Sequence, residues 1–148
     1  MSDDSDAFGV ADIQVDALSG PDADDVQDAV GPEPLDVLVF FTPRESTREV
    51  LEAVFAAGAG RISDYEEACF VSEGTGQFRP VRDASPVIGH LGELEHVLEH
   101  RVELVLPRRL RDEVVAALLE AHPYEVPAFH VLETVRPFGS GVDPRSGA

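Results

Sequence analysis

Residues 121–127, with the sequence Ala-His-Pro-Tyr-Glu-Val-Pro, constrain the fold more than any other stretch of this chain. Proline disfavours the helical conformation in the residue before it and has no backbone N–H to donate. We therefore expect Pro123 to end a helix at His122, and Pro127 to mark the edge or the start of a strand. The segment should be a corner between two elements, and it places an imidazole, a phenol and a carboxylate together.

Hydrophobic patterns near the start of the domain predict a strand that leads into a helix. Residues 37–41 form a continuous apolar run of strand length, which is typical of a strand buried on both faces. Thr42 then offers an N-cap, Pro43 suits the first helical position, and Glu45 can complete a capping box. Apolar residues at helical spacing follow, and the Gly-Ala-Gly sequence of residues 58–60 should end this helix.

The remaining patterns predict three further strands and a second helix. Residues 65–71 can form the second strand, and a glycine-rich turn at residues 73–76 follows it. Apolar and charged residues alternate over residues 98–106, which predicts a third strand. A helical stripe over residues 110–121 and a last strand over residues 126–132 complete the order β-α-β-β-α-β. This is the split arrangement of ferredoxin-like α+β sandwiches, in which an antiparallel sheet carries both helices on one face.

The acidic residues are concentrated at the N-terminus. The net charge is -18, and residues 1–36 contain eleven of the 29 Asp and Glu residues but no Arg. A segment of this composition cannot bury enough apolar surface to offset its ordering entropy. We therefore expect an acidic disordered tail at residues 1–34, a domain at residues 35–136 and a flexible tail at residues 137–148. The charge also disfavours nucleic acid as a partner, because Lys and Arg are needed to bind phosphate backbones.

Residue types that are absent or rare exclude several kinds of chemistry. The sequence has no Lys, which removes P-loop lysines, Schiff bases and Ser-Lys dyads. Cys69 is the only cysteine, so it cannot form an internal disulfide, and no Ser-His-Asp or Cys-His arrangement can be defended. The N-terminus lacks the pattern of a secretion signal, and no apolar run approaches the roughly 20 residues that span a bilayer. We expect a soluble cytoplasmic protein with no membrane partner.

Several motifs together resemble a known family. Residues 122–127 resemble the motif at the same helix–strand junction of the CutA proteins, which are trimeric ferredoxin-like relatives of the PII signalling proteins. The domain as a whole is similar to the PII-like insert of the Nif-three-like family, often labelled GTP cyclohydrolase I type 2 by homology. The motifs that carry this second resemblance occur in the family's order, and they are residues 58–60, Tyr65, 73–80, 86–89, 92–95 and 121–125.

The resemblance implies a ferredoxin-like domain that assembles as a homotrimer. Full-length family members resemble dinuclear metal proteins, whose His and carboxylate ligands lie in two lobes that flank the insert. This chain has no room for those lobes, so we expect the insert to stand alone, without the family's metal centre and without enzymatic activity. Trimerisation would also cover the sheet face that the helices leave open.

The glycine-rich segment is the first candidate site. Backbone amides around Gly74, Thr75 and Gly76 could bind a small-molecule ligand, as glycine-rich loops bind phosphates. The segment does not lead into a helix, however, and no Lys accompanies it. The alternative is a tight turn that needs a positive φ at Gly74 and Gly76. PII-like proteins hold ligands in clefts between subunits, and this resemblance keeps a ligand role open for the segment.

The proline-flanked corner is the second candidate site. His122 and Glu125 could bind a divalent metal such as copper or zinc, with Tyr124 as a hydrogen-bond partner at a subunit boundary. Two side chains fall short of the roughly four ligands of a closed site, but a three-fold axis could multiply them. The alternative is structural: the corner caps the helix, and Tyr124 packs on a neighbouring subunit.

A pair of histidines at spacing four is a weaker metal candidate. His96 and His100 would share one face of a helix, but their neighbours alternate with strand periodicity. Four strand residues span roughly 13 Å, which is too far for both imidazoles to reach one ion. We therefore expect half-buried strand histidines.

Three functions remain as hypotheses. The first is a non-enzymatic, oligomeric PII/CutA-like module for small-ligand sensing or scaffolding. The second is divalent metal binding or tolerance of the CutA type, with His122 and Glu125 as ligands. The third is a metal-dependent hydrolase related to the full-length Nif-three-like proteins, which the absence of room for the flanking lobes disfavours.

Overall fold

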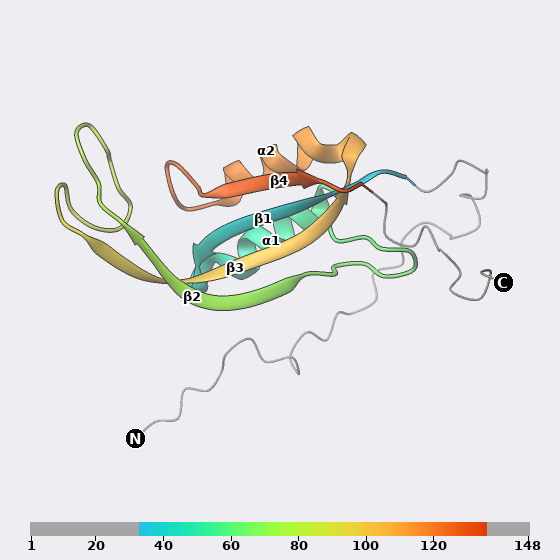
Figure 1. Cartoon of the computed structure of the whole chain (residues 1–148), viewed down its shortest axis with the longest axis horizontal. Coiled ribbons are helices and arrows are strands. Elements are labelled where there is room, and N and C mark those ends of the chain that lie inside the picture. The colour runs from blue at the N-terminus through green and yellow to red at the C-terminus, as the bar shows by residue number, and fades with distance from the viewer. Residues whose placement is uncertain (1–32, 136–148) are drawn as a thin grey trace, which may run out of the picture.

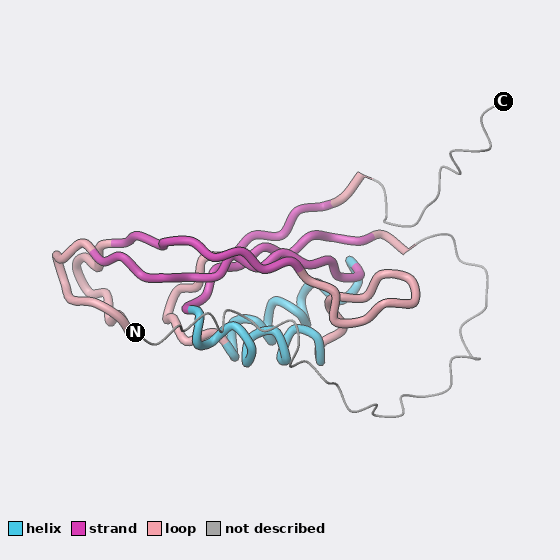
Figure 2. The backbone as a smooth tube through the Cα atoms, turned by 90° about the horizontal axis from the view of Figure 1, so that it is seen from below, coloured by secondary structure: helices cyan, strands magenta, loops and turns pink. Residues whose placement is uncertain are grey.

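A computed structural model describes residues 33–135, which form a four-stranded sheet with two helices on one face (Figures 1 and 2). The elements are β1 (Leu35–Pro43), η2 (Arg44–Ser46), α1 (Thr47–Ala56), β2 (Phe70–Phe78), β3 (Glu95–Pro107), η3 (Arg108–Leu110), α2 (Arg111–Ala121) and β4 (Phe129–Glu133). The strand order is β2-β3-β1-β4, and each neighbouring pair is antiparallel. This is the predicted ferredoxin-like α+β arrangement.

The core lies between the sheet and its two helices. Side chains alternate between the faces of a strand, so the even-numbered residues of the central strands β1 and β3 point toward the helices. Phe40 of β1 and Val102 of β3 are opposite each other in the ladder, and both are fully buried. Apolar residues at helical spacing on α1 and α2 close this layer, as the sequence predicted. The core residues of the helices are Val50, Leu51, Val54, Val114 and Leu118.

A buried ionic network holds one end of the sheet. Asp36 of β1 is 0% exposed, and its two carboxylate oxygens accept the Nε–H groups of Arg108 and Arg111, each at 2.8 Å. Arg111 also donates to Glu133 of β4 at 2.7 Å. Charges taken out of water must be paired, and this pairing ties β1, η3, α2 and β4 together.

The start of the first helix differs from the prediction. β1 extends through Pro43, and the short helix η2 comes before α1, so Thr42 is not an N-cap. Thr42 pairs with His100 in the ladder, and this strand position turns its side chain toward the helices. Its hydroxyl is buried without a hydrogen-bond partner among the described residues, and no side-chain cap bonds the start of α1.

The second and last strands begin later than predicted. Residues 60–69 form a turn-rich segment, with positive φ at Ser63 and Glu67, and β2 begins only at Phe70. β4 begins at Phe129, two residues after Pro127. The third strand and the second helix match their predicted positions closely, and His122 ends α2 in an extended conformation as expected.

The predicted tails are outside the part of the chain that the structure describes, apart from residues 33 and 34. Within residues 33–135, neither α-helix has the length and apolar character needed to cross a membrane.

Candidate functional site: a pocket at the helix–strand corner

A pocket of about 330 Å³ lies where the ends of β2 and β3 meet the corner between α2 and β4. Its walls come from three parts of the chain that are distant in sequence: the strands, residues 79–88 of the β2–β3 connection, and residues 124–128. The β2–β3 connection projects beyond the body of the sheet (Figure 1). The pocket therefore brings together three of the sequence motifs, which are residues 73–80, 86–89 and 121–125.

His122 fixes the start of the corner. The imidazole is 6% exposed, its Nε2 lies 2.6 Å from the Phe41 carbonyl oxygen, and its Nδ1 accepts the Tyr124 N–H at 3.1 Å. A carbonyl only accepts and an amide N–H only donates, so these partners define a neutral ring with its proton on Nε2. Burial lowers the pKa of His122, which favours the same neutral form.

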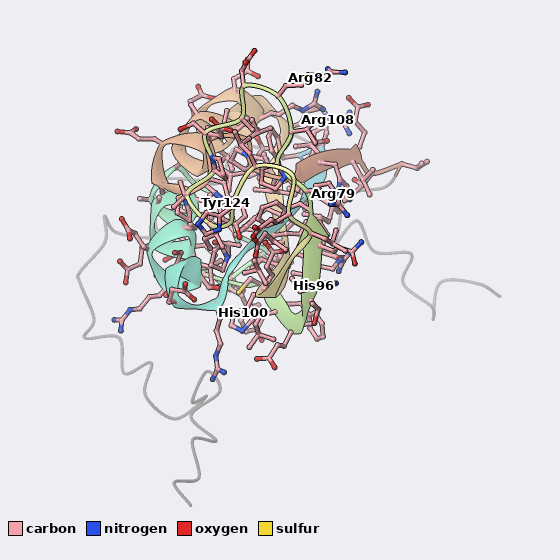
Figure 3. The ribbon with its side chains drawn as sticks, turned by 90° about the vertical axis from the view of Figure 1, so that its left-hand side faces the viewer. Arg79, Arg82, His96, His100, Arg108 and Tyr124 are labelled. Atoms are coloured by element: carbon pink, nitrogen blue, oxygen red, sulfur yellow. The ribbon has the colours of Figure 1, made fainter. Side chains whose placement is uncertain are left out.

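Tyr124 is the residue by which the corner contributes an aromatic ring to the pocket wall. Its hydroxyl donates to Oε1 of Glu99 at 3.1 Å, and its ring packs edge-on against Phe78, with 6.1 Å between the centroids. Burial, followed by the hydrogen bond to Glu99, raises the pKa of the Tyr124 phenol, so the group stays a donor. Figure 3 looks onto this end of the molecule and shows Tyr124 near the middle of the view and Arg82 at its edge.

Glu99 is the buried carboxylate of the pocket. It is 9% exposed and lies directly opposite Gly74 in the ladder. Its carboxylate lies over Gly76, where a Cβ atom would overlap with Oε2. Glycine at position 76 thus leaves the room that the carboxylate occupies.

Glu125 and Arg79 hold the β2–β3 connection against the rest of the domain. Oε1 of Glu125 accepts the backbone N–H of Ser85 at 3.0 Å, which ties the corner to this connection. Arg79 donates to the Gly92 carbonyl oxygen at 2.6 Å, which links the two ends of the connection. Both residues line the pocket, but these hydrogen bonds already engage their charged groups.

The predicted glycine-rich turn is wrong as a conformation. Gly74, Thr75 and Gly76 lie inside β2, where they pair with Glu99, Leu98 and Val97, and neither glycine has a positive φ. Gly76 leaves space for the Glu99 carboxylate, whereas a Cβ at Gly74 would meet nothing within 4 Å. Gly76 lines the pocket, so a role of this segment in ligand binding stays a prediction.

The two histidines of β3 lie in a strand, as expected, but the prediction that both are half-buried is wrong, because one is exposed and the other is buried. His96 is exposed and its Nε2 lies 2.9 Å from the Gln77 side-chain oxygen. His100 is buried, with its Nδ1 2.8 Å from the Thr47 hydroxyl. Burial lowers the pKa of His100. Their different surroundings give them no shared site.

His122 and Glu125 both lie in the corner, but each side chain already makes a hydrogen bond there. The lone pair of His122 Nδ1 already accepts a backbone N–H, and Glu125 accepts another. A metal at these residues would have to displace those hydrogen bonds, and this role stays a prediction. A second group with metal-binding side chains is His90, Glu93 and Glu95, whose ligand atoms lie within 4.8 Å of one another.

Sequence reasoning missed Glu99. It stands in an alternating strand, in the same charged series as Arg101 and Glu103, where exposure would be the default expectation. A glycine inside a strand often marks a site where another group approaches closely, and Gly76 was the available signal. That signal was obscured because the two glycines were assigned to a turn.

The sequence is similar to proteins named GTP cyclohydrolase 1 type 2 homolog. It is 48% identical to the Mycobacterium tuberculosis protein over 141 residues, which are 94% of this chain and 37% of that protein. Identity to the Bacillus subtilis protein is 41% over 99 residues, which are 67% of this chain and 26% of that protein. The chain thus spans about a third of the length of these relatives. No protein-family model matches it.

Solved structures show the same relationship. A Bacillus cereus protein related to NIF3 superposes with a TM-score of 0.61 at 36% identity, over 72% of this chain and 27% of that one. The chain is a Nif-three-like domain with a CutA-like fold. CutA from Synechococcus elongatus has a TM-score of 0.51 at 16% identity, over 71% of this chain and 80% of its own. At such identity, the likeness of the Nif-three-like domain to CutA concerns the fold.

Proposed function

We propose that this Nif-three-like domain is a non-enzymatic, oligomeric module that senses or presents a small ligand, and that the ligand binds in the pocket beside Tyr124. The observation that carries the proposal is the convergence of three separate motifs on one cavity. The β2 glycine segment, the β2–β3 connection and the helix–strand corner all line it.

The size and lining of the pocket support a small organic ligand. A cavity of about 150 Å³ holds benzene, and small-molecule sites begin at roughly 300 Å³. The pocket, at about 330 Å³, has room for more than one ring. Its walls are mainly apolar, with Phe41, Phe78 and Ile88 among them, and they carry few polar groups. Such a lining is typical of ligand sites.

A blocking variant tests the proposal. Val87 lines the pocket and is exposed, so Val87→Trp should fill the cavity without disturbing the core. Val81→Trp is the matched control, because Val81 is exposed on the same connection but does not line the pocket. A metabolite library is then screened by thermal unfolding. A ligand at a hundredfold its Kd adds about 2.7 kcal/mol to the stability of the native state.

We expect at least one compound to stabilise the wild type and Val81→Trp, but not Val87→Trp. A library that stabilises all three proteins equally would place the ligand elsewhere. A library that stabilises none of them would argue against small-ligand binding by this domain.

We further propose that the domain forms a homotrimer. Phe70 of β2 and Leu132 of β4 are exposed, and the strand register places both on the face opposite the helices. A second copy would cover such apolar positions. Light scattering at micromolar concentration should give the trimer mass, and a monomer mass would refute the assembly.

Divalent metal binding is the second candidate. A CutA protein of Archaeoglobus fulgidus is named a periplasmic divalent cation tolerance protein, and its TM-score with this chain is 0.52 at 12% identity. Calorimetry with copper and zinc on the wild type, His122→Ala and His90→Ala would locate any site. Equal binding by the wild type and His122→Ala would remove the proposed role of the corner.

We also propose that the domain alone does not catalyse a hydrolytic reaction. The N–H of the neutral His122 ring points to a carbonyl, and the raised pKa of Tyr124 keeps its phenol protonated, so that no phenolate is present to act as a base. Turnover of GTP by the purified chain, lost in His122→Ala, would contradict this.

A further inference from the structure

We infer that the ligand of this pocket is a small organic cation with N–H donors, such as an amidine, a guanidine or an amine, held by the Glu99 carboxylate. This inference rests on the proposed ligand-binding function, because it assigns a chemical class to the same pocket. The observation behind it is a buried carboxylate that has no cationic partner within residues 33–135.

Glu99 is unusual among the buried charged groups of the domain. Asp36, which is also buried, is paired with two arginines. Glu99 is 9% exposed, yet among the described residues it accepts one hydrogen bond, from the neutral Tyr124 hydroxyl, and forms no ion pair. Buried carboxylates are normally paired with a cation or with several donors. The missing partner therefore points to a bound cation.

The two oxygens of Glu99 have different surroundings. Oε1 accepts the Tyr124 hydroxyl, and Oε2 packs against Gly76, in the space that a side chain there would occupy, with no hydrogen-bond partner among the described residues. Both Glu99 and Gly76 line the pocket. Tyr124 thus orients the carboxylate, and Oε2 is the atom available to accept an N–H from a ligand.

The other charged groups at the pocket do not supply the partner. Arg79 lines it, but its guanidinium donates to the Gly92 carbonyl, and no ion pair connects it to Glu99 in the described chain. Glu125 adds a second negative charge, although a backbone N–H already binds it. Anionic ligands such as phosphates would face two carboxylates, so the charge balance favours a cation.

The aromatic walls fit the same class of ligand. Phe41, Phe78 and Tyr124 line the pocket, and aromatic faces attract cations as well as apolar surface. A ligand that combines a flat apolar body with a terminal cation would use both features. A cation without an apolar body, such as a metal ion, would use only the carboxylate.

Three compounds of nearly identical shape test the charge: benzamidine, benzamide and benzoate carry a positive, zero and negative charge. Their affinities for the full chain are measured by calorimetry or ligand-observed NMR. A charge-assisted hydrogen bond exceeds a neutral one by roughly tenfold to a hundredfold in affinity. We expect benzamidine to bind more tightly than benzamide by that factor, and benzoate to bind most weakly.

Glu99→Gln should abolish the preference for benzamidine over benzamide. Glutamine keeps an oxygen for the Tyr124 hydroxyl and nearly the same shape, so the fold should persist, and circular dichroism checks this. Glu125→Gln is the matched control, because it removes a charge at the same pocket, and it should keep most of the preference.

The outcomes separate this inference from the proposed function. Equal binding of the three compounds, or strongest binding of benzoate, would overturn the cation inference and leave small-ligand binding intact. The same holds if none of the three binds while the library contains a ligand that Val87→Trp excludes. If neither set binds, both proposals fail. If Glu99→Gln changes the oligomer mass and benzamidine does not bind, the cation is a side chain of a second copy, which also overturns the inference.

Discussion

Two glycines in β2 offer a sharp test of the pocket. Gly74 and Gly76 lie two residues apart on the same face of one strand, and neither needs a positive φ. A Cβ at Gly74 would meet nothing within 4 Å, whereas a Cβ at Gly76 would overlap with the Glu99 carboxylate. Replacing each by Ala should therefore change stability in opposite directions.

The magnitudes follow from two competing effects. Ala in a compatible extended conformation stabilises by about 0.4–1 kcal/mol, because it restricts the unfolded chain. Overpacking costs about 1–3 kcal/mol, and Tyr124 restrains the movement of Glu99 that would relieve it. We expect Gly74→Ala to stabilise by roughly 0.5 kcal/mol and Gly76→Ala to destabilise by roughly 1–2 kcal/mol.

A double-mutant cycle isolates the contact. In a Glu99→Ala background the overlap disappears, so Gly76→Ala should become stabilising by about the same amount as Gly74→Ala. Urea unfolding at one fixed protein concentration gives the free energies, since assembly would make them depend on concentration. The coupling energy between positions 76 and 99 should be about 2 kcal/mol.

Two results would refute this reasoning. If Gly76→Ala stabilises as much as Gly74→Ala, the carboxylate of Glu99 does not lie over position 76. If both alanines destabilise, and still do so in the Glu99→Ala background, the glycines occupy a turn with positive φ, and their placement in β2 is wrong.

Three further predictions concern buried polar groups. Asp36→Asn should cost about 3 kcal/mol in urea unfolding, because it removes the buried charge that Arg108 and Arg111 share and leaves them the more exposed Glu133. Burial lowers the pKa of His122 in the native state. Below about pH 6.5, His122 is therefore protonated in the unfolded state while it stays neutral in the native state. Stability should thus be full above that pH and fall as the pH drops toward the native pKa, by up to about 1.4 kcal/mol per unit, and His122→Gln should flatten the curve. Tyr124 should ionise at a higher pH than an ordinary phenol in a spectrophotometric titration, and Glu99→Gln should shift its titration back down.

Each of these predictions has a matched control. Glu52→Gln removes an exposed pair with Arg48 and should change stability by less than about 0.5 kcal/mol. His90→Gln replaces an exposed ring and serves as the control for the exchange of His for Gln itself. His100 will keep a residual slope in His122→Gln, because burial also lowers its pKa. Tyr65→Phe leaves Tyr124 as the sole phenol, since the chain has two tyrosines. Equal effects of a variant and its control would contradict the corresponding prediction.

The sequence allowed the order of elements to be predicted because periodicity is a local property. The alternation in residues 98–106 and the helical stripe in residues 110–121 each need only near neighbours to be recognised. The stop at His122 was equally local, since Pro123 acts on the residue before it. These elements were found close to their predicted positions.

The errors arose where a partner distant in sequence decides the structure. Thr42 has the chemistry of an N-cap, but pairing with β3 keeps it in the strand. Gly74 and Gly76 have the composition of a turn, but the ladder with β3 extends through them. Intrinsic preference is a weak guide when strand pairing opposes it.

The dependence on distant partners also explains why the buried carboxylate of the pocket was missed. His122, Tyr124 and Glu125 were recognisable because two prolines frame them, yet they serve here to neutralise a ring, orient a carboxylate and anchor the β2–β3 connection. Glu99 lies 25 residues from Tyr124 along the chain, and nothing in its own neighbourhood sets it apart. Its burial results from the meeting of strand, connection and corner. Gly76 lies on the neighbouring strand, two residues from the ladder partner of Glu99, and it is therefore better evidence for the buried carboxylate than the residues around Glu99 itself. The Gly76–Glu99 double-mutant cycle measures the coupling between the two positions directly.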